Sequence, residues 1–200
     1  GCWISPASSL LPVLGWGVAV TGVIGVFCSV MIYVFTRRDF WNFAATATKF
    51  SLTSALLGIA ATLFAILLFD KFADTPATHQ LATEVGTQLI QALMTVFAFK
   101  IVVELLLFRH LFARRQSPLK RSARLLVGPL AGSMFARLAC GIVGGLFMPL
   151  ILWNSLAAED WAGPVMILSA GLLFATLVAG ELIERYQFFA ACAAPRMPGR

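Results

Sequence analysis

Five long apolar runs fill most of this 200-residue sequence and leave short connections between them. They lie at about 10–35, 50–69, 85–108, 127–153 and 163–190. At about 1.5 Å per residue, each run is long enough to cross a hydrocarbon core about 30 Å thick as an α-helix. A transmembrane β-barrel needs alternating segments of about ten residues, and the sequence has none. The sequence therefore predicts an all-α, polytopic transmembrane helix bundle of about five spans, forming a single unit over 1–200.

The composition agrees with a membrane environment. Hydrophobic residues make up 60% of the chain, charged residues only 12%, and the mean hydropathy is +0.88. Soluble domains carry about 25% charged residues, so soluble globular, disordered and disulfide-scaffold classes are excluded. The four cysteines are scattered without metal-site spacing, and we expect the apolar ones to act as packing residues. The sequence opens without Met, which indicates a removed leader or the later part of a longer protein.

Basic residues gather in alternate connections. One side of the chain carries Arg37, Arg38, Lys49, Arg109, Arg114, Arg115, Lys120, Arg121, Arg124, Arg196 and Arg200. The other side carries Asp70, Lys71, Asp74, Glu84, Glu159 and Asp160. By the positive-inside rule, we expect the N-terminus outside, loops 36–49 and 109–126 in the cytoplasm, and the C-terminus inside. The net charge of +6 is then explained by topology and by contact with membrane lipids, and no nucleic-acid partner is expected.

Six ionisable residues fall inside the apolar runs. They are Lys100, Glu104, Arg137, Glu181, Glu184 and Arg185. A charge at the centre of a membrane helix costs about 2.5–3.5 kcal/mol on insertion scales, so such residues are usually paired or functional. All six belong to the cytoplasmic half of the membrane or its boundary with the centre, and the three on the last run share one helical face. Two interpretations remain open: a charge-neutral network that holds spans three, four and five together, or the lining of a ligand or proton path.

Span three carries polar residues on two faces. Lys100 and Glu104 are four residues apart and can meet directly. The outer half of the span shows a second stripe on nearly the opposite face: Glu84, Gln88, Gln91 and Thr95. Neither face can meet lipid without cost. We therefore expect span three to be internal, with protein or water on both sides.

Local features of the other spans predict how they pack. Small residues recur at four-residue spacing at Thr21, Gly25 and Ser29, at Ser54, Gly58 and Thr62, and at Gly132, Ala136, Cys140 and Gly144. Such ridges let helix backbones approach closely in lipid, so we expect packing seams. The stretch IVGGLFMPL (142–150) predicts a kink in span four.

Several kinds of chemistry are excluded for the chain alone. A haem held between helices needs two axial ligands at similar depth. The two histidines, His79 and His110, belong to opposite sides of the membrane in the expected topology. There is no cysteine cluster for iron–sulfur ligation, no phosphate-binding glycine loop and no nucleophile–base arrangement. We therefore expect no metal, no haem, no iron–sulfur cluster and no catalytic residue in this chain.

The end of the chain resembles a known family. The segment AGELIERYQFFAACAAPRMPG (179–199) is similar to the closing helix of the anchor subunits of dimethyl-sulfoxide-reductase-type molybdoenzymes. In that family a Gly-Glu-Leu-(Ile/Leu)-x-Arg run precedes an aromatic pair. The matching residues are Gly180, Glu181, Leu182, Ile183, Arg185, Phe188 and Phe189. The stretches MIYVFTRRDFW (31–41) and KIVVELLLFRHL (100–111) also resemble that group, less specifically.

The resemblance implies an integral membrane-anchor subunit of the bacterial inner membrane. It would oxidise quinol, either menaquinol or ubiquinol, and pass electrons to an iron–sulfur subunit and then to a molybdopterin catalytic subunit. The anchor itself binds no metal in this family. Its members are longer and carry a His-Leu-Gly-Ser-Pro-like stretch in their first half, which is absent here, so the similarity covers only their later part. No family role carries over to His79 or His110.

Within this hypothesis the six intramembrane charges would line the quinol site or a proton route, and loop 109–126 would be a docking surface for the electron-transfer partner. The alternative from another class is a secondary transporter or channel that uses the same charges as a substrate or proton path. A structural subunit without a ligand is the third hypothesis.

Overall fold

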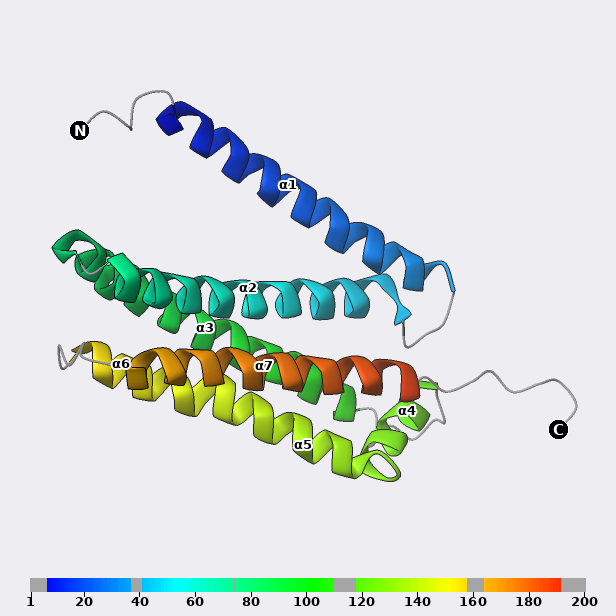
Figure 1. The fold of residues 1–200 in the computed structure, drawn as a ribbon. Coiled ribbons are helices and arrows are strands. Elements are labelled where there is room, and N and C mark those ends of the chain that lie inside the picture. Colours follow the sequence, from blue (N-terminus) through cyan, green and yellow to red (C-terminus); the bar gives the residue numbers. More distant parts are fainter. Residues whose placement is uncertain (1–6, 37–40, 74, 110–117, 158–163, 192–200) are drawn as a thin grey trace, which may run out of the picture. The chain divides into compact units, whose positions relative to one another are not determined.

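The computed structural model describes residues 7–36, 41–73, 75–109, 118–157 and 164–191, and the regular structure in these ranges is helical (Figure 1). The elements are α1 (Ala7–Val34), α2 (Phe43–Ala73), α3 (Pro76–Phe108), α4 (Pro118–Val127), α5 (Ala131–Ile142), the π-helical segment η3 (Val143–Phe147), α6 (Met148–Ala157) and α7 (Pro164–Ala190). Five stretches of these helices are long and apolar enough to cross a membrane. The all-α prediction is confirmed, and the five candidate spans suggest a multi-pass membrane protein.

The chain forms two compact units, Gly1–Ser51 and Leu52–Arg200. In the first unit, the ring of Tyr33 near the end of α1 lies 5.5 Å from the ring of Trp41 and 5.5 Å from that of Phe50, centroid to centroid. These contacts hold the end of α1 against the start of α2. The side chain of Asn42 accepts a hydrogen bond from a backbone N–H of the first turn, which caps the N-terminus of α2.

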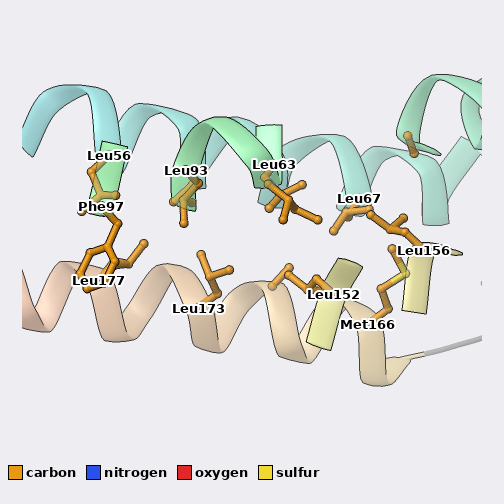
Figure 2. Packing of buried hydrophobic residues seen from close by; sticks show 14 residues of the cluster. Leu56, Leu63, Leu67, Leu93, Phe97, Leu152, Leu156, Met166, Leu173 and Leu177 are labelled. Atoms are coloured by element: carbon orange, nitrogen blue, oxygen red, sulfur yellow. The ribbon is translucent and has the colours of Figure 1, made fainter. Parts of the chain in front are cut away.

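The second unit packs the rest of α2 with α3, with the α5–η3–α6 span and with α7 around one apolar core (Figure 2). The fully buried members include Leu56, Leu63, Ile90, Leu93, Leu152, Leu173 and Leu177. On each helix these positions recur every three or four residues, which places them on one face. The face of α3 that packs inward carries Ala82, Gly86, Ile90, Leu93, Phe97, Lys100 and Glu104.

Span four is not a regular α-helix. Its middle turn is the π-helical segment η3, which contains Gly144 and Gly145 and comes just before Pro149. Proline lacks an N–H and its ring crowds the carbonyl four residues earlier, so a wider turn at this place relieves the clash. The sequence predicted a kink over 142–150, and the structure has a π-helical turn there.

The two glycines of η3 are required by close approach to other helices. A Cβ atom on Gly145 would lie 2.4 Å from the ring of Phe97 in α3, and one on Gly144 would lie 2.6 Å from the hydroxyl of Thr176 in α7. In the same way, a Cβ atom on Gly180 would lie 3.3 Å from the Cβ atom of Cys140. The second half of the small-residue ridge on span four is therefore a packing seam against α7, as predicted.

The corresponding ridge on span two lies outside the core of the second unit, and a packing seam there stays a prediction. Ser54, Gly58 and Thr62 are exposed on α2, and a Cβ atom added to Gly58 would meet nothing within 4 Å. The core uses the opposite side of this helix, because the larger leucines lie there.

The expected loop 109–126 contains a helix. Helix α4 buries Ser122, Ala123 and Leu126 and exposes Arg124. This amphipathic pattern allows the segment to pack on the bundle next to α3 and α5. Span four consequently begins at Ala131, after a turn that contains Pro129, and not at about 127 as predicted.

Candidate functional site

Five of the six predicted intramembrane charges meet in one place in the second unit. A threonine of α2 joins them, and we call the whole set the ion cluster: Thr53, Lys100, Glu104, Arg137, Glu181 and Glu184. None of these residues is more than 9% exposed. The five charges of the ion cluster, which lie within apolar runs, are therefore paired with one another, and pairing is how charges are tolerated in a membrane helix.

Lys100 is the centre of the ion cluster. Its Nζ atom lies 2.6 and 2.5 Å from the two carboxylate oxygens of Glu181 and 2.7 Å from Oε2 of Glu184. It also donates to the hydroxyl of Thr53 at 2.8 Å. An ammonium group has three protons, so these four oxygens share its donors. The side chain is 2% exposed, and all of its bonding capacity is directed at α2 and α7.

The hydroxyl of Thr53 completes the Lys100–Glu181 pair. It accepts the bond from Lys100 and donates its own proton to Oε2 of Glu181 at 2.6 Å. The threonine thus connects a cation and an anion through one group that both donates and accepts.

Arg137 forms the second half of the ion cluster. Both of its Nη atoms contact the carboxylate of Glu104, in the two-pronged arrangement that guanidinium and carboxylate groups favour. Its Nη2 atom also lies 3.5 Å from Oε2 of Glu184. Because that same oxygen contacts Lys100, Glu184 bridges the two halves. The resulting network links four helices, α2, α3, α5 and α7.

Local sequence spacing explains this geometry. Glu181 and Glu184 are three residues apart, which places them on one face of α7. Gly180 lets that helix approach α5 closely, so both acids reach into the bundle. Lys100 and Glu104 lie one turn apart on the buried face of α3, and each forms ion pairs with a different helix.

The sixth predicted residue, Arg185, is on the same helix as the two bridging acids but is only partly buried. The bonds described above do not involve it. The ion cluster holds three acids and two bases. Arg185 lies four residues after Glu181, and with it the six predicted residues comprise three acids and three bases.

The participation of span two was missed by the sequence analysis. Thr53 lies in the segment FSLTSALL, which contains three hydroxyl residues, Ser51, Thr53 and Ser54. Hydroxyl side chains are common in membrane helices and often bond to their own backbone, so their presence alone does not identify a site. Only the packing of α2 against α3 and α7 selects Thr53.

The first half of α3 carries the second polar stripe on the side away from the core of the second unit. Glu84, Gln88, Gln91 and Thr95 are exposed, on the side of the helix opposite to its buried face. The core of the second unit covers one face of span three, and that face also carries Lys100 and Glu104. Protein or water on the polar stripe as well stays a prediction.

The end of the bundle away from the ion cluster holds a second polar contact. Nδ1 of His79 lies 3.0 Å from Oδ2 of Asp70, which joins the start of α3 to the end of α2. His110 lies outside the described residues. Among the residues that the structure describes, no three His, Cys, Asp or Glu side chains are grouped so that they could hold a metal ion.

An open groove of about 420 Å³ lies between the second half of α2 and the start of α3. It is lined by Ala61, Thr62, Ala65, Ile66, Phe69, Thr78 and Leu81. It contains no ionisable side chain and lies at the other end of the helices from the ion cluster.

Comparison of the chain with protein-family models, with curated proteins and with solved structures finds no match. A functional interpretation therefore depends on the geometry of the ion cluster and on the motif of the closing helix.

Proposed function

We propose that this chain is a membrane-anchor subunit of a quinol-linked molybdopterin oxidoreductase complex in the bacterial inner membrane. It passes electrons from membrane quinol to an iron–sulfur partner subunit, which supplies a molybdopterin catalytic subunit. Menaquinol and ubiquinol are the two candidate electron donors.

The observation that carries this proposal is the position of Glu181. This residue is the acid of the closing motif that resembles the anchor-subunit family, and it is bonded to Lys100 and Thr53 in the ion cluster. The neighbouring motif residues also have clear roles, because Gly180 permits close packing and Phe188 is 4% exposed. The motif therefore builds a buried, hydrogen-bonded acid in a membrane helix bundle, and buried acids in such places mark proton routes.

Proton handling is the chemistry that quinol oxidation requires of the membrane subunit. Oxidation of one quinol to quinone breaks two O–H bonds, sends two electrons to the iron–sulfur partner and releases two protons. A carboxylate held by an ammonium group and a hydroxyl can accept such a proton and pass it along the hydrogen bonds. In this proposal Glu181 is the first acceptor, and Glu184, which shares the ammonium group of Lys100 with it, is the second.

Basic residues favour an electron-transfer partner at the same end of the bundle. The ion cluster lies toward the C-terminal ends of α3 and α7, and α4 packs against α3 and α5 (Figure 1). Arg109 and Arg124 are exposed there. Exposed bases attract acidic protein surfaces and anionic lipid headgroups. A partner docked at this end lies close to quinol oxidised near the ion cluster.

The test is isolation of the chain from its native membrane with its partners. We expect iron–sulfur and molybdopterin chains to co-purify and the complex to oxidise a reduced quinol analogue. A complex with intact partner subunits and no quinol oxidation contradicts the proposal.

One observation favours a secondary transporter or channel as the second candidate. The π-helical segment η3 interrupts span four, with two glycines, six residues after Arg137. Interrupted helices often line substrate sites in transporters. Ion or solute transport by the purified chain in proteoliposomes, without any redox partner, would support this candidate over the anchor subunit.

A further inference from the structure

The outward side of α3 carries a row of polar side chains that nothing in the ion cluster explains. We call it the polar face of α3, and its members are Gln80, Glu84, Gln88, Gln91 and Thr95. At 3.6 residues per turn they fall within an arc of about 80°. All five are exposed. The arc lies opposite to the side of α3 that packs into the core.

The depth of this face follows from contacts between α2 and α3. These antiparallel helices touch between Asp70 and His79 at one end and between Thr53 and Lys100 at the other. The uncharged stretch 50–69 of α2 is about 30 Å long, which matches the hydrocarbon core. Interpolation between the two contacts places Gln91 level with the middle of that stretch.

The side chains of Gln88 and Gln91 therefore lie near the middle of the membrane. Within the described ranges neither amide has a hydrogen-bond partner, whereas Gln80 donates to Glu84 at 3.0 Å and Thr95 donates to a backbone carbonyl of its own helix at 2.8 Å. An amide at this depth is too short to reach the headgroups, and lipid tails offer it no hydrogen bond. A protein surface with hydrogen-bonding groups is what satisfies it.

We propose that the polar face of α3 is the interface through which two copies of this chain associate in the membrane. An amide both donates and accepts hydrogen bonds, so a glutamine is complementary to a second glutamine. Two copies with the same topology place Gln88 and Gln91 of each at the same depth, because a two-fold axis along the membrane normal preserves height. A second copy thus supplies matching groups at the right level, which a helix of arbitrary sequence does not.

The remaining residues of the face are compatible with this pairing. Glu84 lies toward the outer end, where the like charges of two copies are close to water and Gln80 already bonds to it. Below Thr95 the same side of α3 becomes apolar, with Phe99 and Val102 exposed. These side chains extend the contact toward the inner end and need no hydrogen bonds.

The first test is energy transfer between donor- and acceptor-labelled full-length chains in vesicles of phosphatidylethanolamine and phosphatidylglycerol. We expect the wild-type chain to associate and the double variant Gln88→Leu/Gln91→Leu to associate about tenfold more weakly, since each interhelical hydrogen bond changes association by a few-fold. The matched control is Leu168→Val/Leu172→Val, which changes two exposed residues of α7. Lys100 and Glu181 are in contact and so lie at the same depth. Gln91 precedes Lys100 by nine residues and Leu172 precedes Glu181 by nine residues, so Gln91 and Leu172 also lie at similar depths. Equal association of the wild type and the glutamine variant overturns the proposal.

The second test identifies the partner in native membranes. A benzophenone probe is attached to Gln91→Cys, or to Leu172→Cys as the control, in a full-length chain whose native cysteines are replaced by alanine. We expect irradiation of the first variant to give a product of twice the chain mass, and irradiation of the control to give none. Capture of lipid alone, of another polypeptide or of α1 in the same chain overturns the proposal.

Discussion

Replacing Lys100 by methionine removes the central cation of the ion cluster while keeping a side chain of similar length. The lysine is 2% exposed and contacts three oxygens of Glu181 and Glu184 within 2.7 Å. In the variant, Glu181 keeps the hydroxyl of Thr53, and Glu184 keeps Arg137 at 3.5 Å. The variant then holds three buried acids, Glu104, Glu181 and Glu184, and one cation, Arg137, which is already paired with Glu104.

The magnitude follows from the cost of leaving a buried charge without its partner. Removal of one member of a buried ion pair typically destabilises by about 3–5 kcal/mol, whereas replacement of the whole pair by neutral groups is often close to neutral. Because both acids keep one partner, we expect Lys100→Met to lower the free energy of unfolding by about 3 kcal/mol, the lower end of that range. The double variant Lys100→Met/Glu181→Gln should recover at least half of this loss.

The assay is reversible unfolding in mixed micelles with increasing dodecyl sulfate, followed by far-ultraviolet circular dichroism. The matched control is Lys71→Met, an exposed lysine near the end of α2, which should change stability by less than about 0.5 kcal/mol. If Lys100→Met is as stable as the wild type, or if the double variant is no more stable than the single one, the ion-pair reasoning is refuted.

Two further predictions concern packing and the threonine. Gly145→Ala should destabilise the protein by about 1–3 kcal/mol, because its Cβ atom would lie 2.4 Å from the ring of Phe97. Gly58→Ala should be neutral or stabilising, because nothing lies within 4 Å of the added Cβ atom. The same unfolding titration measures both variants, and equal effects on stability would contradict the packing argument. Thr53→Val should lower the free energy of unfolding by about 1 kcal/mol, since it leaves Lys100 and Glu181 each with one hydrogen bond fewer. Thr53→Ser keeps the hydroxyl and should retain most of the wild-type stability. If Thr53→Ser is as unstable as Thr53→Val, the methyl group matters more than the hydrogen bonds.

The helices and the pairing of charges could be predicted from the sequence. Apolar runs of membrane length leave few alternatives to transmembrane helices. Charges within such runs must be paired, and the three-residue spacing of Glu181 and Glu184 already places both on one side of α7. The cost of isolated charges in lipid therefore made the ion cluster predictable as a set.

The partners within the ion cluster could not be predicted in this way. Lys100 and Glu104 have the spacing of a local ion pair, yet the contacts of Lys100 are with α7 and those of Glu104 are with Arg137. The choice between a local and a cross-helix partner depends on how closely helices approach, and glycines such as Gly180 set that distance. The hydroxyl of Thr53 enters for the same reason.

Exposure of small and polar residues was the second point that the sequence left undecided. The ridge that includes Gly58 and the polar face of α3 both have the pattern of contact surfaces, and both lie outside the core of the second unit. A sequence pattern indicates that a surface can be in contact, but it does not say whether the contact lies within one chain or between chains.

The proton-accepting role of Glu181 is the central functional claim, and a comparison of two activities in the purified complex tests it most directly. Glu181→Gln is compared with Glu84→Gln, which removes an exposed acid outside the ion cluster. Each complex is assayed with a quinol and with a reduced viologen dye that donates electrons directly to the catalytic subunits. Because a general base typically contributes a factor of about 10²–10⁴, we predict that Glu181→Gln lowers quinol-linked turnover at least about tenfold and leaves viologen-linked turnover unchanged. Quinol-linked turnover equal to that of Glu84→Gln, with only the stability of the complex reduced, would contradict the claim and make Glu181 a structural brace.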